Sequence, residues 1–434
     1  MLTNKPMKMI QTPLPRTFFY TIFLILGLAA LSACSSLKPQ AEGNIKAASN
    51  QANKNIPAIT AVDLNAFQSL NSILPKLAIH KAVLVGEIHT RYGDHLNQLA
   101  VIKGLHQRWG KMAIGLEMVQ QPYQSALDDY IAGRINEHDM LRRTQWYDRW
   151  KYDFRLYRPI FRYAKQNRIP LVALNVPKEI TRRITKVGIN GLTAKERAQL
   201  PRTLDKSNPA YTARLKKVFG GHMKTSSKRF AQFMEAQLAW DEGMASQAAR
   251  YLQRHPGYKM VIIAGGGHVI NREGIPDRLQ RRIHSKPAVV LNNINGIPNP
   301  TQGDFLLLSK DVKLPEAGKL GIAMKESDAK NGVIVSLVQA HSAAAKAGIQ
   351  TGDKIVRLGN MPIRASEDVL LWALDKKPGD SAMLLLKRNQ QMLTKKITLR
   401  KARPMSMSGM SFKMHPGRFK HGKKHGKHSK KHPR

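Results

Sequence analysis

The sequence is short of two kinds of residue, cysteine and the acidic residues. Its 434 residues include a single cysteine, Cys34, so no internal disulfide can form. Aspartate and glutamate together number 29 against 71 lysines and arginines, which leaves a formal net charge of +42. Such a charge favours anionic partners, for example nucleic acid, acidic lipid headgroups or a ligand that carries carboxylates. The length predicts two or three domains.

The N-terminal region lacks an apolar run long enough to span a membrane comfortably. Basic residues precede an apolar stretch at 18–30, which has the length of a signal-peptide core. It ends in Leu31-Ser32-Ala33-Cys34, which resembles the lipobox of bacterial lipoproteins. The resemblance implies a signal peptide at 1–33 and a diacylated Cys34, and Ser35 after it implies the outer membrane, on the periplasmic side. Export makes nucleic acid an unexpected partner despite the charge.

Two segments share one pattern, in which an apolar run stops at glycine and histidine follows. Residues 81–89 (KAVLVGEIH) deliver Glu87 and His89, and residues 260–268 (MVIIAGGGH) deliver His268. Continuous apolar runs without alternation are typical of strands buried on both faces of a parallel sheet. Such sheets bind ligands at the carboxyl ends of their strands.

Three further strands are predicted at 112–117, 169–175 and 288–291, and helical patterns alternate with them. Glu117 and Asn175 end two of these strands. The alternation predicts an α/β fold, a mostly parallel sheet flanked by helices. Because the strand ends meet at one edge, we expect five polar side chains to converge there: Glu87, His89, Glu117, Asn175 and His268.

The remaining segments define the predicted organisation. Residues 34–60 have no apolar period and are expected to tether the lipidated N-terminus to an α/β domain at 61–300. The long helical pattern at 226–254 is expected to be interrupted at Gly243. The tail, 401–434, carries eleven lysines and arginines, five histidines and no acid, so it is predicted to be disordered and to attract anionic surfaces.

Residues 315–400 resemble a PDZ domain. Leu320, Gly321 and Ile322 stand where PDZ domains carry the carboxylate-binding loop, and residues 343–355 (AAAKAGIQTGDKI) resemble the PDZ signature. The resemblance implies a small α+β domain that binds the C-terminal peptide of an envelope protein as an added strand. The alternative is a degenerate PDZ domain that serves only as a spacer or dimer contact.

Five motifs in order, GEIH, GLEM, ALN.P, AQLAWDEGMA and AGGGHV, make residues 71–291 similar to the ChaN-like haem-binding lipoproteins. That family belongs with the TIKI proteases and the erythromycin esterase-like proteins. The resemblance implies a haem-binding lipoprotein of iron acquisition, with a homodimer bracketing the ligand. No Cys-x-x-Cys-His is present, so a b-type haem would be held noncovalently through His or Tyr. The candidate cofactor-binding residues are Glu87, His89, Tyr92, His95, Glu117, Asn175, His222 and His268.

The aromatic-rich stretch 146–163, with Arg149, Arg155 and Arg158, is expected either to supply the walls and propionate anchors of a haem site or simply to pack helices.

A hydrolase uses the same strand ends differently. Glu87, His89, Glu117 and His268 supply two imidazoles and two carboxylates, which suffice for a divalent metal and a general base. No His-Glu-x-x-His motif is present, so the metal rests on the superfamily alone. Haem binding is the favoured interpretation, and a metal-dependent hydrolase or peptidase is the alternative.

Overall fold

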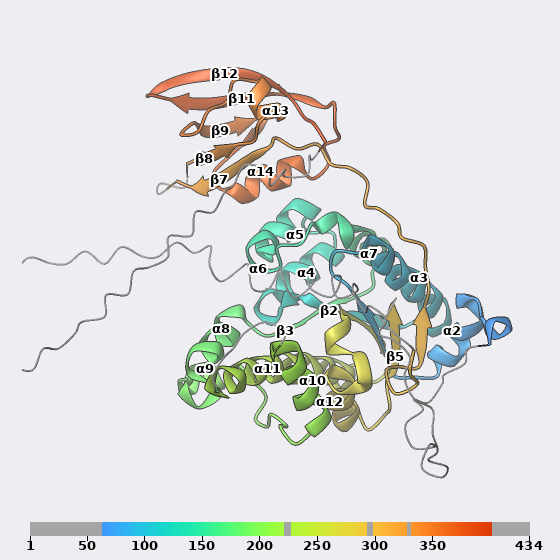
Figure 1. Ribbon diagram of the computed structural model, residues 1–434. Coiled ribbons are helices and arrows are strands. Elements are labelled where there is room, and N and C mark those ends of the chain that lie inside the picture. Colours follow the sequence, from blue (N-terminus) through green and yellow to red (C-terminus); the bar gives the residue numbers. More distant parts are fainter. Residues whose placement is uncertain (1–62, 221–226, 293–297, 328–330, 402–434) are drawn as a thin grey trace, which may run out of the picture. The chain divides into compact units, whose positions relative to one another are not determined.

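The computed structural model describes residues 63–220, 227–292, 298–327 and 331–401 (Figure 1). The chain divides into two compact units, Met1–Pro315 and Glu316–Arg434. The predicted signal peptide, the lipidation site Cys34, the tether, His222 and the tail from residue 402 on lie outside the described residues. Within the described ranges, no helix combines the length and apolarity needed to cross a bilayer.

The first unit is built on a six-stranded sheet in the order β3-β2-β4-β1-β5-β6. All five pairings are parallel, which confirms the predicted fold class. β4 lies between β1 and β2, so the carboxyl ends of these three strands are neighbours. The strands are β1 (Ala82–Glu87), β2 (Met112–Gln120), β3 (Leu171–Asn175), β4 (Lys259–Gly265), β5 (Ala288–Asn292) and the short β6 (Phe305–Leu307).

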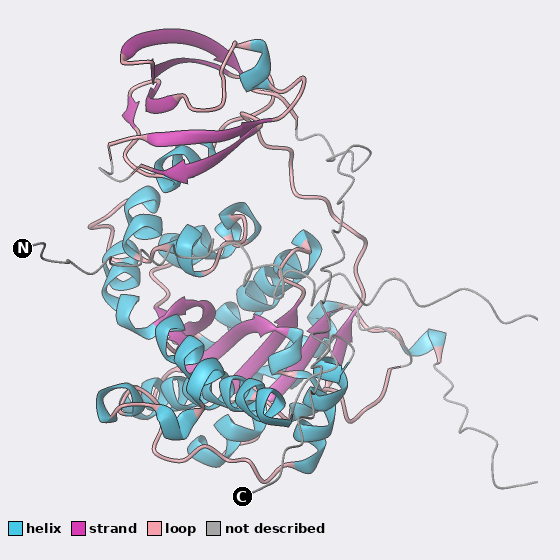
Figure 2. Cartoon of the chain, turned by 60° about the vertical axis from the view of Figure 1, so that its left-hand side comes forward, coloured by secondary structure: helices cyan, strands magenta, loops and turns pink. Residues whose placement is uncertain are grey.

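Helices cover both faces of this sheet (Figures 1 and 2). α11 and α12 pack on one face, where Leu84, Ile262 and Val172 meet Ala245 and Ala248 of α11. α3, α4 and α7 belong to the other layer. Because both faces are covered, every residue of β1 is buried. The helices are α2 (Leu70–Ala78), α3 (Tyr92–Trp109), α4 (Gln124–Ile131), α5 (Glu137–Arg143), α6 (Trp146–Arg149), α7 (Arg158–Gln166), α8 (Lys178–Val187), α9 (Ala194–Arg197), α10 (Pro209–Gly220), α11 (Ser227–Arg254) and α12 (Ile275–Ile283).

The predicted interruption of the long helix at Gly243 is wrong. α11 runs unbroken from Ser227 to Arg254. A side chain at Gly243 would overlap Val176, the residue that follows β3. The glycine therefore marks a close approach of helix to sheet and not a break in the helix.

The second unit is a small α+β domain, as predicted, with a five-strand path β12-β11-β9-β8-β7 and β10 paired to β9. β7 is an edge strand that pairs only with β8 along this path. Leu320, Val335 and Leu384 belong to its core. The elements are β7 (Ile322–Glu326), β8 (Val333–Val338), α13 (Ala343–Lys346), β9 (Lys354–Leu358), β10 (Met361–Pro362), α14 (Ser366–Ala373), β11 (Ser381–Arg388) and β12 (Gln391–Thr398).

A buried ionic cluster joins α11 to α12. Glu242 is 1% exposed and pairs with the equally buried Arg278 at 3.2 Å and with Arg282 at 2.5 Å. Its Oε1 also accepts a hydrogen bond from the backbone N–H of Asp205 (3.0 Å). Removal of the carboxylate would leave Arg278 charged and without its acidic partner in the interior.

We therefore expect Glu242→Ala to lower the free energy of unfolding by ~3–5 kcal/mol, measured by urea denaturation. Asp277→Ala is the control, since Asp277 pairs with Arg281 at 3.0 Å on the exposed side of α12. It should cost less than ~1 kcal/mol. Equal losses for the two variants would contradict the structural role given to the buried cluster.

Candidate functional site

The register of three strands brings the predicted polar residues together. Glu87 at the end of β1 lies opposite Gly265 at the end of β4, and Leu116 of β2 lies opposite Ile263. Glu117, the next residue of β2, therefore reaches the same level of the sheet edge. Its Oε2 accepts a hydrogen bond from the Gly265 N–H at 2.6 Å.

His89 is held in place by its carboxylate neighbour. Its Nδ1 lies 2.6 Å from Oε1 of Glu87, whose side chain is fully buried, whereas the His89 side chain is 27% exposed. The Tyr157 hydroxyl donates to the same Glu87 oxygen (3.3 Å). No hydrogen bond reaches His89 Nε2 from the residues described here. The ring is thus fixed through one nitrogen and leaves the other for a ligand or a proton.

Aromatic rings and a bare backbone enclose His89. Its ring centroid lies 4.7 Å from that of Trp150 and 4.9 Å from that of Tyr152. A β-carbon added to Gly265 would come within 2.8 Å of Cε1 of His89. Glycine at this position lets the imidazole lie directly over the end of β4.

His268 forms the second histidine–carboxylate group, and it has two acidic partners. Its Nδ1 lies 2.6 Å from Oδ1 of Asp241, and its Nε2 lies 3.4 Å from Oε1 of Glu117. The Tyr211 hydroxyl donates to Oδ2 of Asp241 (2.7 Å). A chain of hydrogen bonds therefore runs from α10 through α11 to the sheet edge.

Neighbouring charges shift the pKa values of the histidines and of Glu117 in this site. Burial alone would lower the pKa of His268, but Glu117 and Asp241 raise it well above its ordinary value. Burial likewise opposes ionisation of Glu117, yet His268 and then His89 lower its pKa to about 2. The pKa of His89 is also raised, because Glu87 and Glu117 outweigh the effect of burial. The two acidic partners therefore favour the protonated form of His268.

The other predicted residues have different places. Asn175 donates through Nδ2 to the Glu117 carbonyl (2.9 Å) and so supports the backbone of β2. His95 is 1% exposed, and its nitrogens lie 3.1 Å from Gln98 Oε1 and 3.2 Å from the His89 carbonyl, so both ring nitrogens have partners within the chain. Tyr92 lines a separate cavity, described next, and His222 is not among the described residues.

That cavity, of about 370 Å³, lies between the starts of α3 and α7. Its polar residues are Tyr92, Arg155, Arg158 and Arg162. Arg155 pairs with Asp153 at 2.5 Å, and Arg158 pairs with Glu137 at 2.5 Å. A carboxylate entering this cavity would compete with acids of the chain.

The aromatic stretch 146–163 packs helices, as one of the two expectations for it stated, and its role as the wall of a haem site stays a prediction. Trp146, Phe154 and Phe161 are buried and pack edge-on against one another. Trp150 and Tyr152 flank His89 instead. Arg149 pairs with Glu179 at 3.0 Å, so it too has an acidic partner in the chain.

Three residues of the site escaped prediction, namely Asp241, Tyr157 and Tyr211. Asp241 lies in the motif AQLAWDEGMA, which was identified but not assigned to the strand edge. Tyr157 lies in the aromatic stretch. Both are recognisable only once the helices are placed against the sheet.

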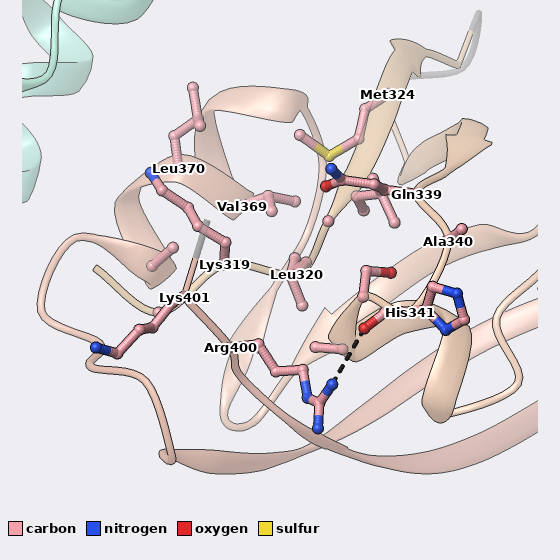
Figure 3. Close-up of a pocket in the computed structure, with 16 residues that line it drawn as sticks. Lys319, Leu320, Met324, Gln339, Ala340, His341, Val369, Leu370, Arg400 and Lys401 are labelled. Carbon is pink, nitrogen blue, oxygen red and sulfur yellow. Dashed lines mark hydrogen bonds between the residues drawn. The ribbon is translucent and has the colours of Figure 1, made fainter. Parts of the chain in front are cut away.

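A second groove lies in the other unit, between β7 and α14 (Figure 3). It has a volume of about 250 Å³, and Leu320, Gly321 and Ile322 line it, as the carboxylate-loop prediction requires. Gly321 has a φ of +76°, and a side chain there would overlap Ser342. Glycine is therefore needed for the loop to form.

The loop presents unused hydrogen-bond donors. The carbonyls of Leu320 and Gly321 accept from Ala344 N–H and Gln339 N–H, each at 2.9 Å. The N–H groups of Leu320 and Gly321 donate to no other described residue. Two backbone donors beside an open groove suit a carboxylate.

The side chains at the carboxyl ends of the strands determine which metal ion or cofactor this site can bind. Across the described ranges, no group of three or more His, Cys, Asp or Glu side chains is arranged to hold a metal ion. The imidazole of His89 has the features of an axial haem ligand, namely an Nε2 without a hydrogen bond to the described residues, aromatic neighbours and a buried carboxylate behind it.

The two units match two known families. Residues 73–279 match the family described as haem-binding uptake, Tiki superfamily, ChaN. Residues 318–399 match the PDZ domain. Both resemblances drawn from the sequence are thereby confirmed. No curated protein matches the chain.

Among solved structures, one reports cofacial haem binding to ChaN of Campylobacter jejuni. It is 18% identical with a TM-score of 0.46, and covers 55% of this chain and 91% of its own. The HtrA-type protease AlgW with a decapeptide is 19% identical with a TM-score of 0.20, and covers 20% of this chain and 30% of its own. A serine endoprotease of Yersinia pestis is 28% identical with a TM-score of 0.18, with the same two coverages. The chain thus spans under a third of these proteases.

The lowered pKa of Glu117 predicts an acid-sensitive contribution to stability. With a folded pKa of about 2 against the ordinary 4.5, ionised Glu117 stabilises the fold above pH 4.5, and this is lost as the pH falls toward 2. The unfolding free energy of the wild type should exceed that of Glu117→Gln by on the order of 3 kcal/mol at pH 6. The gap should narrow toward pH 2.5 in urea titrations. A pH-independent gap would contradict the assignment.

Proposed function

Residues 73–279 form a ChaN-like haem-binding domain and residues 318–399 form a PDZ domain, and on that basis we propose a haem-binding lipoprotein that serves iron uptake at the bacterial outer membrane. The protein faces the periplasm, is anchored through Cys34, and binds the C-terminus of an envelope protein in its PDZ groove. The basic tail attaches to anionic surface. A homodimer remains a prediction from the family resemblance.

The observation that carries the haem proposal is the arrangement of His89. Glu87 binds Nδ1 at 2.6 Å and fixes the ring, so that Nε2 is left as the coordinating nitrogen. When haem is bound, its iron supplies a Lewis acid for one such nitrogen. Trp150 and Tyr152 supply apolar contact beside it. The haem is b-type, because the only cysteine, Cys34, precedes the domain.

Tyr92 is the second candidate for the iron. It lies in the cavity that Arg155, Arg158 and Arg162 also line, where guanidinium groups could meet the two propionates. His89 is preferred because its orientation is fixed by a buried partner, whereas the cavity arginines already pair with Asp153 and Glu137. The two assignments make opposite predictions for single variants.

A hydrolytic role is the alternative function, and the two histidine–carboxylate groups on either side of Gly265 favour it. His89 backed by Glu87 has the layout of a general base. His268 between Asp241 and Glu117 would supply a positive charge beside it. Such activity would be lost in both His89→Ala and His268→Ala.

We expect purified protein titrated with haem to develop a shifted Soret band. His89→Ala should weaken binding at least ~10-fold, since it removes the axial ligand, whereas Tyr92→Phe should bind normally. A variant that lacks residues 402–434 removes the five tail histidines and should retain the band. Absence of the band in the wild type, together with ester or peptide hydrolysis, would replace haem binding by the hydrolase. If only Tyr92→Phe lost the Soret band, Tyr92 and not His89 would be assigned as the iron ligand.

Two neighbouring glycines give a matched control for the position of His89. The Gly265→Ala side chain would meet the His89 ring at 2.8 Å, so it should weaken haem binding about as much as His89→Ala. A β-carbon at Gly267 meets nothing described within 4 Å, so Gly267→Ala should bind haem normally. Equal behaviour of the two variants would show that His89 does not depend on the bare backbone of β4.

Anchoring at Cys34 is tested by fractionation of the cells. The full-length protein should sediment with outer membranes, and Cys34→Ser should be released into the soluble fraction, because two or more acyl chains are needed for stable attachment. Ser35→Ala changes a neighbouring residue and should stay in the membranes. If Cys34→Ser remained bound after a high-salt wash, the lipid anchor would be excluded.

A further inference from the structure

One end of the groove between β7 and α14 is apolar. Leu320 forms its floor, and Val369 and Ala373 of α14 line it with Leu320. Leu370 also lines the groove and is 40% exposed. Figure 3 shows Leu320, Val369 and Leu370 around the same opening. This end suits an apolar side chain next to the free N–H groups of the loop.

Positive charge surrounds the same end. Lys319, Arg400 and Lys401 line the groove, and no acidic residue of the described ranges does. Arg400 donates to a neutral acceptor, the His341 carbonyl (3.1 Å), and neither it nor Lys319 forms an ion pair with a described residue. Lys401 pairs with Glu316 at 2.8 Å, but both side chains are well exposed, so the pair is weak. The groove therefore keeps a net positive charge beside its carboxylate loop.

The acidic residues of this region lie outside the set of residues that line the groove. At the far end of β7, Glu326 accepts a hydrogen bond from the Ser366 N–H (3.0 Å). The first turn of α14 carries Glu367 and Asp368. A peptide that pairs with the edge of β7, with its carboxylate at Gly321, places its last residues among the cations that line the groove.

We propose that the PDZ groove favours, among peptides with a free C-terminus, those that carry acidic residues directly before the last residue. This inference rests on the proposed peptide binding and adds a specificity to it. The attraction comes from Lys319 and Arg400, whose charges are not neutralised within the described chain. Because these side chains are at the surface, the preference depends on ionic strength.

The test uses the full-length protein and three fluorescent decapeptides in anisotropy titrations. The first ends in Asp-Glu-Val with a free carboxylate, the second in Asn-Gln-Val with a free carboxylate, and the third is the amide of the first. At about 50 mM salt the first should bind ~5-fold or more tightly than the second, and the gap should shrink at about 300 mM salt. The amide should bind at least ~10-fold more weakly than the first peptide, because it cannot accept from both loop N–H groups as a carboxylate does. The amide also measures any attraction of the acidic residues to the basic tail.

Two charge reversals locate the preference. Lys319→Glu should abolish the advantage of the Asp-Glu-Val peptide over the Asn-Gln-Val peptide. Lys396→Glu makes the same change on β12, at the opposite end of the sheet order from β7, and should preserve that advantage.

The outcomes separate the two levels of the proposal. Equal binding of the two free-acid peptides, with a weaker amide, would overturn the acidic preference and leave peptide binding intact. Equal binding of all three peptides would remove the peptide function itself. An acidic preference that Lys319→Glu and Lys396→Glu reduce alike would assign it to the overall charge of the protein and overturn the role of the groove.

Discussion

The pairing of β1 with β4 is the interaction on which the first unit depends. It sets Glu87 opposite Gly265, and Gly265 then does three things at once. Its N–H binds Glu117, its backbone pairs with β1, and its missing side chain leaves space for the His89 ring. The two histidine–carboxylate groups come from opposite sides of the sheet edge and meet at this residue. A parallel sheet covered on both faces makes the register strict, because a shift by one residue would turn every buried side chain to the wrong layer.

The sequence allowed the strand ends to be predicted because their signal is local. Apolar runs that stop at glycine marked β1 and β4, and the shared direction of parallel strands implied that Glu87, Glu117 and His268 converge. The partners of His268 could not be predicted in this way. Asp241 and Tyr211 lie on α11 and α10, and nothing in a helical pattern tells which residue of one helix will face a given strand end. The burial of His95 could not be predicted for the same reason, since its place on α3 turns it inward to Gln98 and the His89 carbonyl.

The PDZ unit was easier to predict, because its loop and its signature are continuous in sequence. Its charge pattern was not. Lys319 and Arg400 lie far apart in the chain, and they meet because their backbones form a bridge, with the Lys319 N–H donating to the Arg400 carbonyl (2.8 Å) and the Arg400 N–H donating back (3.2 Å). Two backbone hydrogen bonds thus bring two cations to one end of the groove. The groove could be predicted from the resemblance to PDZ domains, whereas its positive charge became visible only in the folded structure.

The insertion of β4 between β1 and β2 has a consequence for how the chain acquires its structure. β1 and β2 leave the ribosome early, yet neither can pair with the other, since the strand that joins them is made much later. Until then the apolar side chains of β1 and β2 and the hydrogen-bonding edges of both strands stay exposed. The contacts that complete the sheet join residues far apart in the chain, which slows their formation. The sheet edge that holds His89 and His268 therefore cannot form until β4 pairs with both earlier strands, so a chain truncated before β4 would lack it.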